Sequence, residues 1–199
     1  MEHPIIDPRS WETHGMGIRD AGLSQTIDYQ CGYCETLVGS QRGMVATGHG
    51  VFAVICPSCG CISMVGMNGY QSPGEAYGNH VENLPDDVKY LYDETRDCYK
   101  TEAYTGAILI ARKCLANVAV DLGAEDGKSF VSYVDYLSEN GYIAPKSRNW
   151  VDEIRKEGNS ATHNRASKNK DDATKILRFL EMLLLINYEF NDLKTPKKD

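Results

Sequence analysis

The strongest chemical pattern in the chain is a set of four cysteines. Cys31 and Cys34 enclose two residues, and Cys56 and Cys59 repeat this spacing after 21 further residues. Two C-x2-C hairpins can offer four thiolates in a tetrahedron, which is the geometry of a structural zinc site. We therefore predict that these four cysteines bind Zn²⁺ in a closed site. The segment GSQRGMVATGHG between the hairpins is predicted to be an extended loop.

Two neighbouring side chains are alternative ligands. Cys61 follows the second hairpin in CPSCGC, and His49 lies in the segment between the hairpins. A strand that leaves the hairpin would turn Cys61 away from the metal, so we place Cys61 outside the ligand set. The pattern shows no open coordination position with a glutamate base beside it, which favours a structural zinc over a catalytic one.

A second pattern combines a cation, an amide and an imidazole. Arg155, Asn159 and His163 follow at intervals of four in EIRKEGNSATHN, residues 153–164. On an unbroken helix these positions lie on one face, within about 80° of each other. His163 could exchange a proton at a ribose 2′-hydroxyl while Arg155 holds the phosphate, and RNA cleavage needs both functions. The pattern is therefore a candidate site for a metal-independent endoribonuclease.

The same residues also have a purely structural interpretation. Gly158 and Asn159 are poorly suited to helix interiors, so this pair can end the helix, with Asn159 as a cap. His163 would then hydrogen-bond a backbone carbonyl. Arg112 is a second candidate cation for the phosphate, because a bundle brings its second and fourth helices close together.

Composition limits the classes of protein to which the chain can belong. Its 199 residues, 42% hydrophobic and 25% charged, suit one ordinary or two small globular domains. No apolar run approaches the roughly 18 residues that span a bilayer, and the first residues lack the pattern of a secretory signal. We expect a cytoplasmic protein with no membrane partner, in which the seven cysteines stay reduced.

The formal net charge of −7 argues against a protein that coats nucleic acid without selectivity. The segment from Lys146 to Lys170 differs from the rest, since it carries seven basic and three acidic side chains. This local positive charge is compatible with a ligand that bears phosphate.

The candidate residues lie in two parts of the chain with different patterns. Residues 1–80 contain short β-prone runs between glycine-rich turns and are predicted to form the zinc-binding segment. Residues 81–199 show helical periodicity and are predicted to form a bundle of about five helices, so the expected fold class is α+β. The predicted helices begin at residue 86 and continue with 102–122, 128–140, 146–157 and 171–193.

Several motifs of the second part resemble the family catalogued as domain of unknown function 4145. They are LPDDVKYLYDE with the helix that follows it (84–123), LSENGYIAP (137–145), VDEIRKEGNSATHN (151–164) and DDATKILRFLEMLLLINYEF (171–190). A cysteine ribbon is a common companion in front of this domain. That family is grouped with the HEPN superfamily, so the resemblance implies a helical bundle that forms homodimers.

The resemblance also implies a function. Many HEPN members are metal-independent RNases in defence against foreign genetic elements, and others are inactive scaffolds or nucleotide-binding helpers. Active members carry an arginine, a polar residue, three variable positions and a histidine. The matching positions here are Gly158, Asn159 and His163, so a glycine replaces the arginine. Ala116 stands where the family usually has a glutamate.

We therefore expect a zinc-binding, HEPN-like module that associates with RNA, a nucleotide or a protein partner in prokaryotic defence. A first alternative is an endoribonuclease that uses His163 and Asn159, with Arg155 or Arg112 on the phosphate. A second alternative is an interaction adaptor that contacts no nucleic acid.

Overall fold

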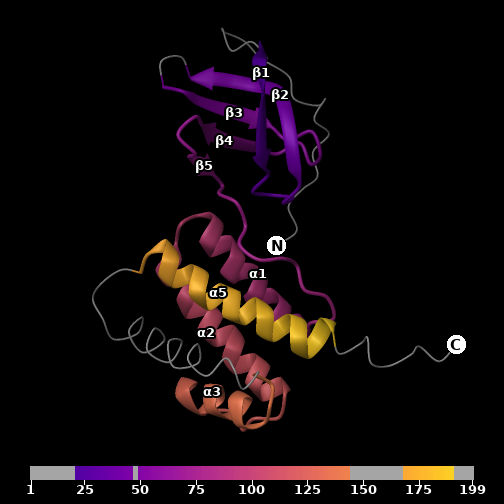
Figure 1. Ribbon diagram of the computed structural model, residues 1–199, viewed down its shortest axis with the longest axis vertical. Coiled ribbons are helices and arrows are strands. Elements are labelled where there is room, and N and C mark those ends of the chain that lie inside the picture. Colours follow the sequence, from indigo (N-terminus) through magenta and orange to yellow (C-terminus); the bar gives the residue numbers. More distant parts are fainter. Residues whose placement is uncertain (1–20, 47–48, 144–167, 191–199) are drawn as a thin grey trace, which may run out of the picture. The chain divides into compact units, whose positions relative to one another are not determined.

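The computed structural model describes residues 21–46, 49–143 and 168–190 of the chain. The chain divides into two compact units, Met1–Ala76 and Tyr77–Asp199. The described strands lie in the first unit and the described helices lie in the second (Figure 1). The predicted α+β class is therefore confirmed.

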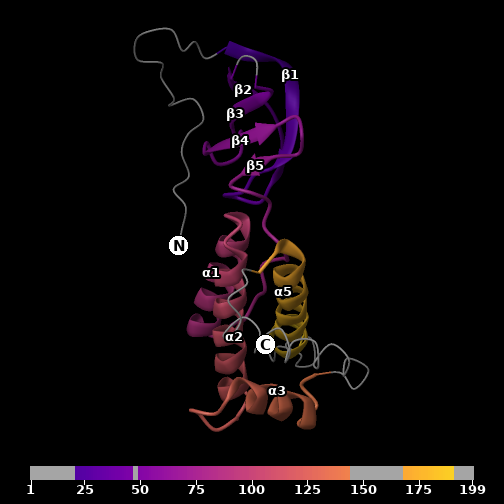
Figure 2. The same ribbon diagram turned by 90° about the vertical axis from the view of Figure 1, so that its left-hand side faces the viewer.

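The first unit is a five-stranded antiparallel sheet in which each strand pairs with its neighbour in the chain. Such hairpin connections need only short turns, and one face of the sheet can bury a core. Ile27 and Tyr29 are buried on this face, whereas Asp28 between them is exposed. The strands are β1 (Ala21–Gln30), β2 (Leu37–Ala46), β3 (Val51–Ile55), β4 (Ile62–Gly66) and β5 (Gln71–Ser72) (Figure 2).

Strand β2 shows that the prediction of an extended loop between the two cysteine hairpins was wrong. Residues 39–46 of that segment belong to β2, which pairs with β1 on one side and β3 on the other. The Ser40 hydroxyl donates to the Ile55 carbonyl at 2.7 Å and ties β2 to the end of β3. Gly39 and Gly43 are unfavourable in a strand, and pairing with β1 and β3 stabilises β2 against their local preference.

The second unit contains four α-helices within its described residues, where the sequence predicted about five. The helix predicted over residues 146–157 lies outside the described part of the chain. None of the described helices combines the length and the apolar character needed to cross a membrane. The α-helices are α1 (Asp86–Lys100), α2 (Tyr104–Asp121), α3 (Phe130–Glu139) and α5 (Lys170–Leu184), and α5 continues into a π-helical turn, η3 (Leu185–Glu189).

The start of α5 follows from its sequence. The Asn169 side chain accepts a hydrogen bond from Asp172 N at 3.0 Å, and the Asp172 carboxylate accepts one from Asn169 N at 3.2 Å. This reciprocal capping box satisfies two backbone donors that a helix end otherwise leaves unpaired. The acidic residues of the first turn, Asp171 and Asp172, also interact favourably with the helix dipole.

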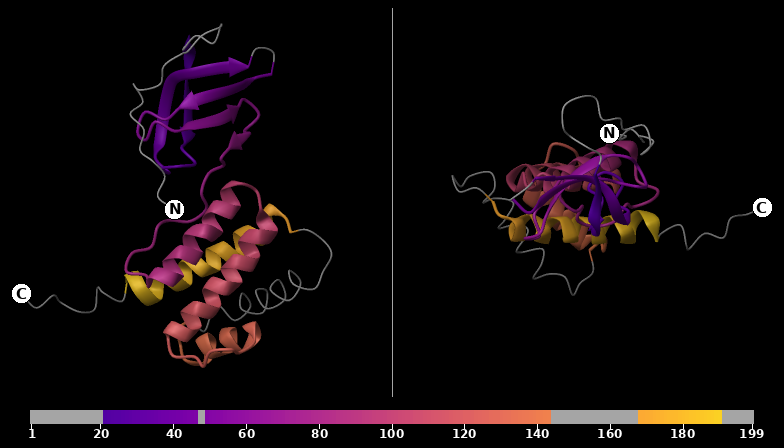
Figure 3. Two further views of the ribbon diagram at one scale, coloured as in Figure 1. Left: turned by 180° about the vertical axis from the view of Figure 1, so that it is seen from behind. Right: turned by 90° about the horizontal axis from the view of Figure 1, so that it is seen from above.

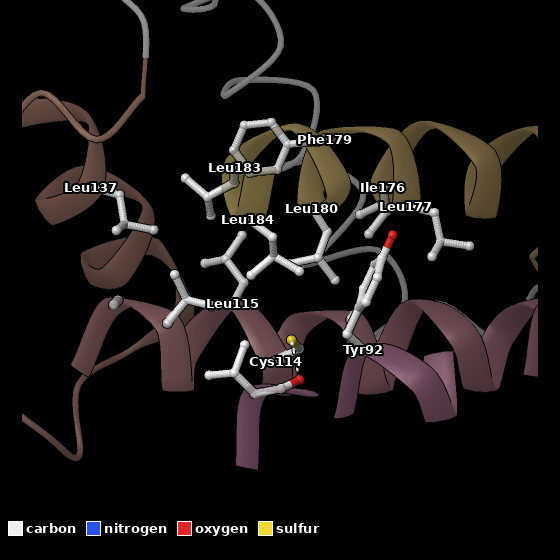
Figure 4. Close-up of a cluster of buried hydrophobic side chains, with 14 of the residues drawn as sticks. Tyr92, Cys114, Leu115, Leu137, Ile176, Leu177, Phe179, Leu180, Leu183 and Leu184 are labelled. Carbon is white, nitrogen blue, oxygen red and sulfur yellow. Dashed lines mark hydrogen bonds between the residues drawn. The ribbon is translucent and has the colours of Figure 1, made fainter. Parts of the chain in front are cut away.

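Helix α2 is apolar on most sides because it lies among the other helices. It packs against α1, α5 and α3, and α3 crosses its C-terminal end (Figures 2 and 3). Leu115 of α2 points toward Leu180 and Leu184 of α5, and all three are buried (Figure 4). Each such side chain stabilises the fold by roughly 1.5–3 kcal/mol.

The segment that precedes α1 is held to the bundle by polar contacts, some of them partly buried and some exposed. Arg96, which is 2% exposed, donates from Nε to the Tyr77 carbonyl at 3.1 Å and from Nη2 to the Gly78 carbonyl at 2.8 Å. Asn79 donates from its backbone N and from Nδ2 to Glu181 of α5, at 2.8 and 2.9 Å. These contacts make the segment an integral part of the second unit.

Candidate metal centre

The first cysteine pair lies in a tight turn between β1 and β2. Cys31 N donates to the Thr36 carbonyl at 3.0 Å, and Glu35 N donates to the Cys31 carbonyl at 2.8 Å. The backbone N–H groups of Tyr33 and Cys34 donate to the Cys31 sulfur. The turn therefore places amide donors against a sulfur, as a metal-bound thiolate requires.

The second pair lies in an equivalent turn between β3 and β4. Cys56 N donates to the Cys61 carbonyl at 2.9 Å, and Gly60 N donates to the Cys56 carbonyl at 2.9 Å. The Cys61 N–H donates to the Cys59 sulfur. The two turns share one backbone hydrogen-bond pattern, and the repeated C-x2-C spacing in the sequence reflects this shared geometry.

These turns bring the four predicted ligands together. The sulfur of Cys31 lies 3.7 Å from that of Cys59, the sulfur of Cys34 lies 3.7 Å from that of Cys56, and all four lie within 4.8 Å of one another. A tetrahedral site with Zn–S bonds of about 2.3 Å separates its sulfurs by about 3.8 Å. A disulfide would need a separation of about 2.0 Å. The spacing of the sulfurs therefore fits a single metal ion.

The thiols differ in how readily they ionise. Burial raises the pKa of Cys31 to about 11 and also raises the pKa of Cys59. Burial opposes ionisation of Cys34 as well, but hydrogen bonds from the Thr36 side chain and backbone and from the other thiols lower its pKa to about 6. Cys34 is thus a thiolate at neutral pH, whereas Cys31 and Cys59 need a bound cation to remain ionised.

The two alternative ligands lie outside the cluster of four sulfurs. Cys61 is buried and occupies the position in the second turn that Thr36 occupies in the first. His49 is exposed in the connection before β3.

Sequence patterns alone did not identify two residues beside this cluster. The Thr36 hydroxyl lies 3.5 Å from the Cys34 sulfur. Tyr29 is 4% exposed and packs in the same buried cluster as the cysteines. The sequence position of Tyr29 could have indicated its place beside the cluster. It lies two residues before Cys31, and alternate residues of an extended chain lie on the same face.

The structure describes one of the four candidate catalytic residues. His163, Asn159 and Arg155 lie outside the described residues, as does Gly158. Arg112 is described, and its guanidinium carbon lies 4.3 Å from the centre of the Phe130 ring. Burial lowers the pKa of Arg112, which remains a cation at any physiological pH.

Comparison with known proteins gives one match. Residues 93–198 match the model of the family described as Domain of unknown function (DUF4145). No curated protein and no solved structure matches the chain.

Proposed function

The chain belongs to the DUF4145 family, and from that premise we propose that it is a zinc-binding, HEPN-like module that associates with RNA. The observation that carries the zinc assignment is the cluster of four cysteine sulfurs within 4.8 Å of one another. Four thiolates with backbone N–H donors suit Zn²⁺ in a closed, structural site. Bound there, the metal would join the β1–β2 and β3–β4 turns and stabilise a sheet with a small core.

The association with RNA is supported by two features of the sequence. The segment from Lys146 to Lys170 carries seven basic and three acidic side chains, whereas the whole chain is acidic. The motifs of the second unit resemble the HEPN superfamily, many of whose members act on RNA. The same resemblance supports a homodimer and a role in prokaryotic defence.

Metal analysis tests the zinc site. Wild-type protein is expected to contain about one zinc ion per chain, and Cys31→Ser is expected to contain much less, because three thiolates hold the metal poorly. Cys98→Ser is the matched control, since Cys98 lies in α1 outside the cluster. Less than half an equivalent of metal in wild type would contradict the site.

Binding of the full chain to a labelled single-stranded RNA tests the association. The affinity should fall steeply with salt, because basic side chains release counterions from the phosphates. An affinity that does not change with salt, or no binding, would favour an adaptor that contacts a protein partner instead.

A cleavage assay in EDTA separates binding from catalysis. An endoribonuclease would cleave the RNA as wild type and lose this activity as His163→Ala. His80→Ala is the matched control, because His80 is an exposed histidine before α1. Absence of cleavage by wild type would contradict the endoribonuclease hypothesis and favour a module that binds RNA without cleaving it.

A further inference from the structure

The segment that leaves the sheet is attached to the first cysteine turn. Strand β5 has two residues, and a strand this short depends on contacts besides its pairing with β4. The side-chain amide of Gln71 supplies them, because it donates to the Gln30 carbonyl at 2.7 Å and to the Pro73 carbonyl at 3.1 Å. Gln71 therefore ties the exit of the sheet to the residue directly before Cys31.

Gly32 makes a second contact between this turn and the exit segment. A Cβ at this position would lie 2.6 Å from the carbonyl oxygen of Pro73 and 2.7 Å from that of Gly74, so the close approach requires a glycine. The equivalent residue of the second turn is Pro57, which is exposed, whereas Gly32 is buried. The two turns share a backbone pattern, and this difference marks the first turn as the one against which residues 73 and 74 pack.

Gln30 links these contacts to the metal centre. Its side-chain amide donates to the Glu35 carbonyl at 3.1 Å, across the turn that carries the first cysteine pair. Gln30 thus closes the cysteine turn with its side chain and accepts from Gln71 with its carbonyl. Metal binding orders the turns that carry its ligands, so it also fixes the carbonyl to which Gln71 donates.

The helical unit holds the chain again directly after this segment. Side chains of α1 and α5 form the hydrogen bonds to residues 77–79 described above. Two residues, Glu75 and Ala76, lie between the part held by the cysteine turn and the part held by the helices. The freedom of the chain between the two units therefore depends on whether residues 71–74 are attached to the turn.

We propose that the metal centre controls this connecting segment: the metal-bound turn holds residues 71–74, and loss of the metal releases them. Gln71 and Gly32 couple the segment to the turn. This inference rests on the proposed metal centre. Because coupling between two sites is reciprocal, the attached segment must raise the metal affinity by the factor by which the metal stabilises the attachment.

Limited proteolysis of the full chain by a glutamate-specific protease measures the release of the segment. Glu75 is exposed, and cleavage after it requires local opening of the chain around it. This cleavage in wild type should be at least about 10-fold faster in EDTA than with zinc. Cleavage after Glu125, which is exposed between α2 and α3, is the internal reference and should not depend on the metal.

Gln71→Met separates this coupling from unfolding of the whole sheet, because methionine has a similar size and lacks both donors. With saturating zinc the variant should bind one ion per chain, yet be cleaved after Glu75 roughly 5–10-fold faster than wild type. Its zinc affinity, measured by competition with a chromophoric chelator, should fall by a similar factor. Gln41→Met is the matched control, because the Gln41 amide donates to the Thr26 hydroxyl at 2.9 Å, outside both cysteine turns. It should change neither quantity.

Equal cleavage after Glu75 with zinc and in EDTA, in wild type that binds zinc, would overturn the inference. Zinc-loaded Gln71→Met that is cleaved as slowly as wild type would also overturn it. Faster cleavage of this variant with unchanged zinc affinity would do the same, since that result marks a contact without coupling to the metal. Wild type that binds no zinc would instead contradict the metal centre itself.

Discussion

Glu35 and Gly60 occupy equivalent places in the two cysteine turns, and both adopt left-handed backbone conformations, with φ of 59° and 75°. For a residue with a Cβ this conformation costs roughly 1–2 kcal/mol of free energy, whereas glycine adopts it freely. The first turn therefore holds a strained glutamate where the second has the favourable residue.

Exchanging these residue types should change stability in opposite directions. Glu35→Gly should raise the free energy of unfolding of the sheet unit by up to about 1 kcal/mol, and Gly60→Ala should lower it by about 1–2 kcal/mol. Urea unfolding of the zinc-loaded protein, monitored through the release of the metal, measures both changes in stability. A Gly60→Ala variant as stable as wild type would contradict the role of the left-handed position.

The thiol pKa values predict how metal affinity depends on pH. Between about pH 7 and pH 8.5 Cys34 is ionised, because its pKa is lowered to about 6, whereas Cys31 keeps its proton, because its pKa is raised to about 11. Cys59, whose pKa is also raised, keeps its proton too. Metal binding must then release at least two protons, so the affinity should rise with pH by at least about 100-fold per unit.

Calorimetry in buffers of different ionisation enthalpy measures this proton release. The affinity should fall still more steeply below about pH 6, where Cys34 also takes up a proton. A metal affinity that is independent of pH would contradict binding by these thiols.

At the scale of elements, the segment before α1 depends on Arg96 of that helix. The guanidinium donates to two successive carbonyls, of Tyr77 and Gly78, at 3.1 and 2.8 Å. A lysine ammonium lacks the planar fork that reaches both acceptors. Arg96→Lys should therefore lower the free energy of unfolding of the bundle by about 1.5–3 kcal/mol.

Urea unfolding followed by far-ultraviolet circular dichroism measures this loss of helix stability. Arg178→Lys is the control, because Arg178 is an exposed residue of α5 and its replacement should change stability by no more than about 0.5 kcal/mol. Equal effects of the two substitutions would contradict the special role of Arg96.

At the scale of the molecule, the folded helical unit begins earlier than the family match. The match starts at residue 93, but the compact unit starts at Tyr77. Val88 and Tyr92 lie in the intervening stretch, are fully buried and belong to the core of the bundle. Losing both removes several kcal/mol from a domain whose whole stability is about 5–15 kcal/mol.

A fragment of residues 77–199 should therefore fold, whereas a fragment of residues 93–199 should not. Circular dichroism should show a cooperative thermal transition for the longer fragment and little helix for the shorter one. Cooperative unfolding of the 93–199 fragment would show that the first half of α1 is dispensable.

The sequence by itself determined the features that depend on local patterns. The C-x2-C spacing indicated two turns that can present thiolates, and helical periodicity located the starts of the described helices to within two residues. The last helix was predicted to continue to residue 193, but its α-helical part ends at Leu184 and a π-helical turn follows. The α+β class follows from the short β-prone runs of the first part and the helical periodicity of the second. A zinc-binding first part and a helical second part could therefore be proposed without a structure.

Only the tertiary structure decided which distant residues meet. Strand β2 forms because β1 and β3 flank it, and its register places Ser40 at the Ile55 carbonyl. Tyr29 is likewise buried in one cluster with cysteines from both turns. Arg96 donates hydrogen bonds to the carbonyls of Tyr77 and Gly78, which lie almost 20 residues earlier in the chain. Such contacts depend on strand register and helix packing, and these are properties of the whole fold that no local run of residues encodes.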